Sequence, residues 1–500
     1  MKPTTHNSAK ITTKVDWLQQ WIPISLILLV ATGLYLYQLG AESLWMDELI
    51  SVDRAKPHNL DIWRVRPLYY LLLSVWMKFG SSDAWLRGLC VLFSLGSVFL
   101  TYRLGRRLVG KSTGLIAAVL ITLSPVFIHH AQEVRMYAPS AFLGLWGSLA
   151  LSHALENPKA LSIAWWAILR WLAILGTPLT LLLLLPDVVL FGWRFRNQPR
   201  ELFAFGKGLL AIGLLWSPWL ITVAMSSAKF MGGVKAPGTV NPALKNSPNL
   251  INVLFQPGRF TAWWFGRPIS NAIYWFYNAY CVMVACLLGF ALFNKQRSNR
   301  LAWIAAWGLL PLVPLFLVSQ ISRSLWVDRY LLFTSPYIFI LLAAGFIAVW
   351  HKWRVGSLVV ALIYLIAAGG ALKRHYTVMD NEDWRGLVET INKNQEPGDL
   401  IVWSIGQTIP RPLNHYYRGS ATIEVRKYGP QATTEGDKPA VESWLDSWPK
   451  TQSRIWLVYA NPSPVFSSVL EEQFNVRSRQ KFEKADVFLL EPHSAPDQEK

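Results

Sequence analysis

Two carboxylates stand side by side in the segment LWMDELISVDR (residues 44–54), which follows the first long apolar run of the chain. They are Asp47 and Glu48. Four basic residues come after them in the same loop: Arg54, Lys56, Arg64 and Arg66. A carboxylate can take the proton of an incoming hydroxyl, and guanidinium groups can hold a phosphate and stabilise the charge that grows on it. This mixture of charges is what transfer of a group from a lipid-linked phosphate needs.

A second dense polar patch occurs in SPVFIHHAQEVRMYAP (residues 124–139). Its polar side chains fall at positions 129, 130, 132, 133 and 135, so they form one patch whatever the backbone does. Each also has a structural explanation, because adjacent histidines at the end of a membrane span are usually interfacial anchors, and Glu133 could simply pair with Arg135. Spacing alone therefore leaves their role open.

The composition indicates which elements must position these residues. Of the 500 residues, 52% are hydrophobic and only 16% are charged, which is typical of a polytopic membrane protein. A helix needs roughly 20 apolar residues to cross a bilayer, and about eleven stretches qualify or nearly qualify. They are 21–39, 84–104, 113–130, 138–155, 161–176, 177–193, 202–223, 271–293, 301–319, 329–350 and 356–372. If 161–193 were instead a single span, every later loop would change sides.

Basic residues set the expected orientation, because lysine and arginine are in excess on the cytoplasmic side. The short loops RLGRRLVGK, WRFRNQPR, NKQRSNR and HKWR all fall on one side, together with an N-terminus that carries lysines and shows no cleavage site. Catalytic outer loops are then expected at 41–83, 129–137, 224–270 and 320–329. In the third of these loops, Trp263 and Trp264 favour a membrane anchor over the lining of a sugar or prenyl groove.

The acidic residues favour chemistry on the outer face. Of the 12 in the first 372 residues, eight fall in expected outer loops and only Asp187 falls within a span. An ion-coupled transporter would instead bury acids near the middle of the bilayer. Asp187 could form a structural ion pair with Arg170.

Residues 373–500 differ in kind, because they hold 16 basic and 18 acidic residues and alternate short strand-like and helix-like runs. The strand-like runs are 399–405, 421–428, 454–460 and 485–491, and the helix-like runs are 381–394, 440–448 and 464–474. This pattern predicts a small α/β domain on the outer face, after a transmembrane domain at 1–372. The tail has neither a glycine-rich phosphate loop nor paired cysteine or histidine ligands. A support domain, an acceptor-docking domain and a merely structural cap all stay open. Nucleic-acid binding is excluded, since the basic excess lies in the membrane part.

Several segments in order resemble the membrane glycosyltransferases of the C-type fold, the group that contains protein O-mannosyltransferases and lipid A aminoarabinose transferases. They are WMDE in the first outer loop, RPLYYLLLSVWMKFG (66–80), QEVRMYA in the second patch, DRYLLFTSPYIFILLAAG (328–345) and DWRGLVETI (383–391). The resemblance covers most of the chain. It implies a mainly helical bundle with outer-face catalytic loops and a small periplasmic α/β domain.

The resemblance also implies roles. Asp47 matches the general base that deprotonates the acceptor hydroxyl for attack with inversion, and Glu48 would either orient it or join a polar network. The family often has a histidine or lysine that faces the donor phosphate, and in this chain Arg66 or, as the alternative, Arg64 stands there. The remaining candidate substrate or phosphate contacts are Tyr69, His130, Gln132, Glu133, Arg135, Tyr137, Arg329 and Tyr330. The outer loops lack an Asp-x-Asp metal clamp, so no metal site is assigned. A divalent metal is optional and no other cofactor is expected.

The resulting hypothesis is an inverting glycosyltransferase of a bacterial inner membrane, multi-pass, with a cytoplasmic N-terminus and a periplasmic C-terminal domain. It moves a hexose or pentose from a polyprenyl-phosphate carrier to a hydroxyl of a lipid, glycan or protein, with membrane lipids and no nucleic acid among its partners. Two alternatives stay open. One is a transporter or flippase of lipid-linked sugars, and the other is a polysaccharide polymerase or ligase that uses diphosphate-linked donors.

Overall fold

The computed structural model describes residues 14–232, 247–262, 271–294, 298–321, 324–406, 409–426, 429–430, 434–448 and 454–493, without the side chains of 14–20, 227–232 and 272. The chain forms two compact units. The first comprises Met1–Leu39 and Ala55–Val378, and the second comprises Gly40–Arg54 and Met379–Lys500. Much of the expected loop 224–270, with Trp263 and Trp264, lies outside the described residues.

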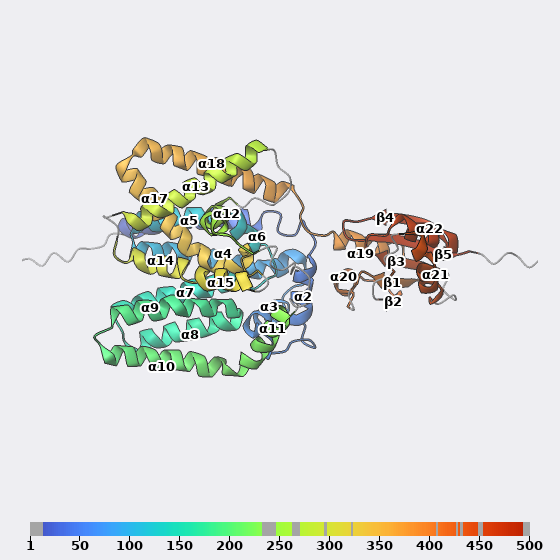
Figure 1. Cartoon of the computed structure of the whole chain (residues 1–500), viewed down its shortest axis with the longest axis horizontal. Coiled ribbons are helices and arrows are strands. Elements are labelled where there is room, and N and C mark those ends of the chain that lie inside the picture. Colours follow the sequence, from blue (N-terminus) through green and yellow to red (C-terminus); the bar gives the residue numbers. More distant parts are fainter. Residues whose placement is uncertain are drawn as a thin grey trace, which may run out of the picture. The chain divides into compact units, whose positions relative to one another are not determined.

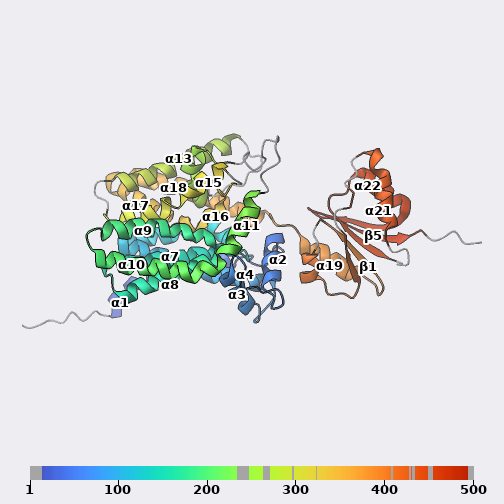
Figure 2. The ribbon, with the colours of Figure 1, turned by 60° about the horizontal axis from the view of Figure 1, so that its bottom comes forward.

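The first unit is helical, and its helices α7 to α10 lie side by side in both views (Figure 1, Figure 2). Its helices are α1 (Lys14–Leu36), α3 (Pro67–Trp76), α4 (Asp83–Leu108), α5 (Lys111–Thr122), α6 (Pro125–Ala131), α7 (Tyr137–Glu156), α8 (Ala160–Gly176), α9 (Leu184–Arg194), α10 (Pro199–Trp216), α11 (Leu220–Gly232), α12 (Leu250–Thr261), α13 (Asn271–Phe293), α14 (Leu301–Leu309), α15 (Leu312–Ile321), α16 (Asp328–Leu331), α17 (Ser335–Lys352) and α18 (Arg354–Thr377). Each stretch expected to span the membrane contains helix.

The number of spans differs from the expectation. Among the described residues, six helices are long and apolar enough to cross a membrane, or seven if the bent pair α5–α6 is one span. The eleven expected spans are therefore not confirmed. Part of the difference lies in 161–193, where α8 has 17 residues and a 3₁₀ segment, Pro178–Leu183, precedes the 11 residues of α9. Apolar composition extends further along the chain than unbroken helix does.

The bend between α5 and α6 sets the direction of the helix that carries the start of the second polar patch, residues 124–139. The two helices meet at 65°, and the Ser124 hydroxyl accepts the backbone N–H of Phe127 at 3.1 Å, which caps α6. Pro125 fits the first turn of the new helix, where its missing N–H costs nothing. The same hydroxyl donates to the carbonyl of Phe260 in α12 at 2.6 Å. The short helix that leads into the patch is thus fixed by its own sequence and by α12.

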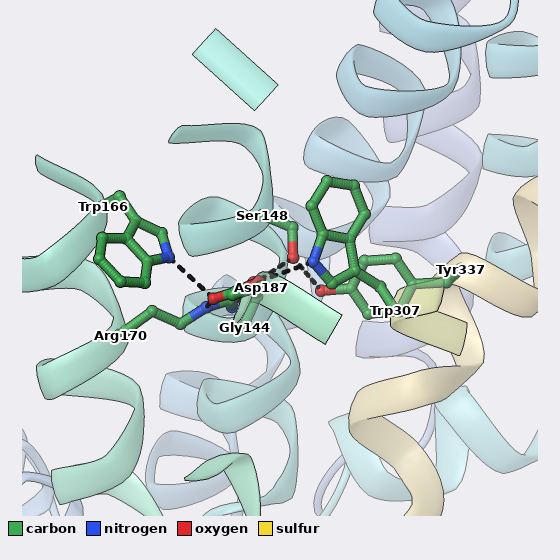
Figure 3. A network of polar contacts seen from close by, with 7 residues as sticks. All are labelled: Gly144, Ser148, Trp166, Arg170, Asp187, Trp307 and Tyr337. Carbon is green, nitrogen blue, oxygen red and sulfur yellow. Dashed lines mark hydrogen bonds and ion pairs between the residues drawn. The ribbon is translucent and has the colours of Figure 1, made fainter. Parts of the chain in front are cut away.

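A buried ion pair joins α8 to α9 (Figure 3). Arg170 donates to both carboxylate oxygens of Asp187, from Nε at 2.6 Å and from Nη2 at 2.9 Å. The indoles of Trp166 and Trp307 donate to the same two oxygens at 2.8 Å. Neither charged residue exposes any surface. The predicted pairing of Arg170 with Asp187 is confirmed, and its partners show why two charges are tolerated inside the bundle.

The guanidinium of Arg170 extends this network to two further helices (Figure 3). It donates to the carbonyl of Gly144 and to the hydroxyl of Ser148, both on α7 and both at 2.7 Å. Ser148 in turn shares a hydrogen bond of 2.7 Å with the hydroxyl of Tyr337 on α17. The Trp307 indole comes from α14. One buried network therefore connects α7, α8, α9, α14 and α17.

The second unit contains a five-stranded sheet with strand order β2-β1-β3-β5-β4. The strands are β1 (Leu400–Ser404), β2 (Thr422–Val425), β3 (Ile455–Tyr459), β4 (Phe474–Lys481) and β5 (Asp486–Pro492). The strands β1, β2 and β3 are parallel, whereas β5 is antiparallel to both β3 and β4. The helices of this unit are α2 (Met46–Ala55), α19 (Trp384–Asn394), α20 (Arg411–Tyr416), α21 (Lys438–Asp446) and α22 (Pro464–Gln473).

Alternation along β1 explains how both faces of the sheet are covered (Figure 2). Leu400 and Val402 pack into one apolar cluster with residues of α21 and α22. Trp403 points to the other face, where its ring lies 6.0 Å from that of Trp384 on α19. The predicted small C-terminal α/β sheet is confirmed. Strand β4 was not predicted, because its sequence FNVRSRQK is polar and mostly exposed.

We expect Asp187→Ala to lower the free energy of unfolding by about 3–5 kcal/mol, because it leaves the Arg170 guanidinium buried without its counter-charge. The double variant Arg170→Leu with Asp187→Leu should lose less free energy of unfolding than a variant with only one of the two residues replaced, since no unpaired charge remains. Unfolding in detergent micelles measures both. A double variant that is less stable than Asp187→Ala would contradict this account.

Candidate functional site

Helix α2 gives its two neighbouring carboxylates different environments. The carboxylate of Glu48 accepts the backbone N–H of Trp45 at 3.1 Å, which closes the N-terminus of the helix as the return half of a capping box does. Glu48 is fully buried, whereas Asp47 is half-buried. The backbone carbonyl of Asp47 accepts the Ser51 hydroxyl one turn later at 3.0 Å. Glu48 therefore closes the helix end, and Asp47 is the more solvent-accessible carboxylate of the two.

In the first unit, the end of α6 and the loop after it form the histidine–glutamate cluster, which consists of His129, His130 and Glu133. Nδ1 of His130 lies 2.7 Å from Oε2 of Glu133, and Nε2 of His129 lies 3.4 Å from Oε1. Burial alone would raise the pKa of Glu133, but the adjacent His130 and His129 outweigh it and hold that pKa well below its usual value. Glu133 is thus an ionised, buried carboxylate at neutral pH.

Gln132 ties this cluster to two distant helices. Its amide Nε2 donates to the carbonyls of Tyr35 at 3.0 Å and Tyr37 at 2.9 Å, at the end of α1. Its Oε1 lies 2.9 Å from Nε2 of His375 in the last turn of α18. The ring of His375 also stands 5.9 Å from that of His129. Gln132 therefore holds the loop in place, and the substrate contact predicted for it stays a prediction.

Two arginines converge on Tyr137 at the start of α7. The guanidinium of Arg135 stands 5.6 Å from the centre of the Tyr137 ring, and that of Arg329 stands 5.3 Å from the centre of the Tyr330 ring. The two tyrosine rings are 6.3 Å apart, and both guanidinium groups interact electrostatically with Tyr137. The His130 ring lies 5.3 Å from Tyr137 on the side of the cluster. Loops that lie far apart in sequence thus meet in one polar group.

Two side chains of α12 bind Asp328, and these bonds also fix the position of its neighbour Arg329 beside Tyr330. Gln256 donates to Oδ1 of Asp328 at 2.8 Å, and Arg259 donates to Oδ2 at 2.9 Å. Asp328 is nearly buried. The structure therefore anchors the start of α16 through α12. Sequence reasoning had noted Asp328 beside Arg329 but did not identify α12 as its partner.

The arginines before α3 are described in the same unit. Arg64 lies 3.8 Å from Asp61 in a largely exposed ion pair. Arg66 precedes Pro67 at the helix start, and among the described residues no hydrogen bond reaches its buried Nε. Tyr69 is buried in the first turn of α3, with its ring 5.5 Å from that of Tyr70. Among the described residues, the buried Nε of Arg64 also lacks a hydrogen bond, so the ion pair with Asp61 is what distinguishes Arg64 from Arg66.

Two residues of the first-unit polar group were missed from the sequence. His129 was seen in the patch but left out of the candidate site residues, although helical spacing to Glu133 is a readable signal. His375 gave no such signal, because it follows the last apolar run and meets Gln132 across 243 residues of sequence. Predicted contacts His130, Glu133, Arg135, Tyr137, Arg329 and Tyr330 do come together. Asp47 and Glu48 belong to the other unit.

The histidine–glutamate cluster is a donor set that could hold a divalent cation. Each of its three residues offers one ligand atom, and these atoms all lie within 4.8 Å of one another. Two imidazoles and a carboxylate are the protein ligands of zinc sites that keep a fourth position open. Among the described residues, no hydrogen bond reaches the buried Nε2 of His130.

This donor set predicts that metal-free protein binds one Zn²⁺ per chain. Glu133→Gln should weaken that binding by about tenfold or more, because it replaces the anionic ligand. Calorimetric titration of chelator-treated protein measures the affinity. His153→Ala is the matched control, because His153 is on α7 and its side chain bonds the carbonyl of Leu149 in the same helix. Equal affinities in wild type and Glu133→Gln would exclude the cluster as the ligand set.

Comparisons with known proteins agree with this architecture. No protein-family model matches the chain. An uncharacterized protein from Aquifex aeolicus (strain VF5) is 29% identical over 219 residues, which cover 39% of this chain and 42% of that protein. The match therefore spans less than half the length of this relative.

Three solved structures are similar over most of this chain. ArnT from Cupriavidus metallidurans, bound to undecaprenyl phosphate, has a TM-score of 0.58 at 14% identity, covering 95% of this chain and 98% of that chain. The oligosaccharyltransferase AglB from Archaeoglobus fulgidus, in complex with an inhibitory peptide and a dolichol-phosphate, has a TM-score of 0.51 at 12% identity, covering 88% and 70%. The arabinofuranosyltransferase AftD from Mycobacteria has a TM-score of 0.51 at 14% identity, covering 96% and 42%. This chain is a membrane protein with the C-type fold of these glycosyltransferases.

Proposed function

We propose that the protein is an inverting glycosyltransferase that moves one sugar from a polyprenyl-phosphate carrier to an acceptor hydroxyl on the periplasmic face of a bacterial inner membrane. The observation that carries the proposal is the convergence of Arg135 and Arg329 on Tyr137 at the ends of apolar helices. The fold supports it, since ArnT was solved with undecaprenyl phosphate and AglB with a dolichol-phosphate.

The proposed reaction uses one proton transfer and one displacement. Asp47 takes the proton of the acceptor hydroxyl as its oxygen attacks the anomeric carbon. The bond between that carbon and the phosphate oxygen breaks with inversion, and the lipid phosphate leaves with the electron pair. Arg135 and Arg329, with Arg66 as a further candidate, neutralise the charge on the departing phosphate. In this scheme Glu48 keeps α2 closed and Asp47 correctly presented.

Asp47→Asn should abolish turnover and leave donor binding within about twofold, because the amide keeps the size of the carboxylate but cannot accept the proton. Purified protein in nanodiscs, supplied with a panel of polyprenyl-phosphate sugars, is assayed for release of free polyprenyl phosphate. Glu389→Gln is the control, since Glu389 is an exposed carboxylate of α19 paired with Lys393. Turnover that persists in Asp47→Asn would overturn the assigned base. No release by wild type, despite donor binding, would point to transport or to a diphosphate-linked substrate.

Arg135→Gln and Arg329→Gln should each weaken binding of undecaprenyl monophosphate by roughly 10- to 100-fold, because each removes a charged partner of the phosphate. Binding is measured by tryptophan fluorescence in nanodiscs. Arg418→Gln serves as the matched control, since Arg418 is an exposed arginine of the second unit. Unchanged affinity in both variants would remove these residues from the phosphate site. Tighter binding of the diphosphate by wild type would favour a polymerase or ligase.

A further inference from the structure

The segment before α2 is bound to the residues that begin the C-terminal part of the second unit. The Ser43 hydroxyl donates to the carbonyl of Glu382 at 2.6 Å. Nη2 of Arg385, in the first turn of α19, donates to the carbonyls of Gly40 and Glu42 at 3.1 Å each. These partners lie more than 300 positions apart in the sequence. A loop of this kind would otherwise be expected to move on its own.

The carboxylate of Glu42 strengthens the same junction. Its Oε1 accepts the backbone N–H of Asp380 at 3.1 Å, and its Oε2 accepts that of Asn381 at 3.3 Å. Hydrogen bonds to an ionised acceptor are stronger than those between neutral groups. One side chain therefore ties two successive peptide groups to the first outer loop.

The C-terminal part also holds α2 from both ends. The backbone N–H of Leu44, which is fully buried just before the helix, donates to the hydroxyl of Tyr416 at 2.8 Å. In the last turn, Oδ2 of Asp53 lies 3.5 Å from Nε of Arg411. Both side chains of this ion pair are more than four-fifths buried, which limits screening by solvent. Tyr416 and Arg411 are the two ends of one short helix, α20.

Two contacts, one before α2 and one near its end, restrain where the helix lies within the second unit. Asp47 stands between them in the first turn. Its proton-accepting oxygen must lie within hydrogen-bond reach of an acceptor hydroxyl. A misplacement of about 1 Å can lower a rate by as much as about 100-fold.

We propose that the C-terminal domain is a positioning device for the catalytic base, in which Tyr416 and Arg411 of α20 hold α2 and thereby orient Asp47. The proposal rests on the proposed function, because it takes Asp47 as the base. Tyr416 and Arg411 are positioning residues, and they touch no substrate. The domain is accordingly a part of the catalytic machinery, in addition to any role in docking the acceptor.

Two measurements on the full-length protein in nanodiscs test the proposal. Hydrogen–deuterium exchange reports whether α20 holds α2, independently of any activity. Tyr416→Phe and Arg411→Glu should each speed amide exchange in residues 44–55 by about tenfold, since each removes one of the two contacts. In the release assay, kcat should fall by about 10- to 100-fold while the affinity for undecaprenyl monophosphate stays within twofold.

Charge reversal separates positioning from a general loss of stability. Asp53→Arg should lower kcat as Arg411→Glu does. The double variant should have a kcat at least threefold higher than that of the poorer single variant, because the ion pair is re-formed with the charges exchanged. The matched control is Arg477→Glu, which breaks an exposed pair with Glu491 elsewhere in the same unit. It should change neither exchange in 44–55 nor kcat.

The outcomes distinguish the two proposals. Unchanged exchange in 44–55 in both α20 variants would overturn the positioning role, whatever the activity. Faster exchange with an unchanged kcat would also overturn it, because α2 would be loosened without consequence for Asp47. If wild type releases no lipid phosphate from any donor, the proposed function fails, and the same exchange data then decide whether α20 holds α2.

Discussion

A charged group inside a membrane bundle must find all its partners within the protein, and Asp187 meets this constraint completely. Its two carboxylate oxygens accept hydrogen bonds from Arg170, Trp166 and Trp307. Because Arg170 also binds α7, and α7 binds α17 through the Ser148–Tyr337 contact, one buried ion pair and its hydrogen bonds connect five helices. Removing any one donor would leave the others around an under-satisfied anion, which makes the network cooperative.

The helices fixed in this way carry the polar group at their ends. Helix α7 begins at Tyr137, and α17 follows directly on the short segment that contains Arg329 and Tyr330. The contact between their tyrosine rings therefore depends on how α7 and α17 are held deep in the bundle. The bent helix α6 and the hydrogen bonds of Gln132 bring His130 and Glu133 to the same place. An apolar scaffold with one buried ion pair thus organises a candidate site built from loops.

Sequence patterns predicted what depends on local composition and missed what depends on distant contacts. The apolar runs, the strands β1, β2, β3 and β5, and the pairing of Arg170 with Asp187 were predictable, because each has a periodic or isolated signature. Unbroken spans were over-counted, since apolar composition does not report where a helix breaks.

The contact of Gln132 with His375 and that of Leu44 with Tyr416 join residues hundreds of positions apart, so no spacing rule could find them. The different environments of Asp47 and Glu48 required the helix boundary, which sequence locates poorly. The catalytic roles assigned by resemblance remain proposals.

The discontinuous second unit has a consequence for biosynthesis. Residues 40–54 leave the ribosome among the first of the chain, but their partners at 379–416 emerge more than 300 residues later. During that interval the helical unit can insert and pack. Helix α2 still lacks its contacts with Tyr416 and Arg411, because these residues have not yet been synthesised. Translation at about 5–20 residues per second makes this delay tens of seconds. Residues 40–54 therefore acquire their contacts with residues 379–416 only when synthesis of the C-terminal domain is nearly finished, which links the maturation of α2 to completion of this domain.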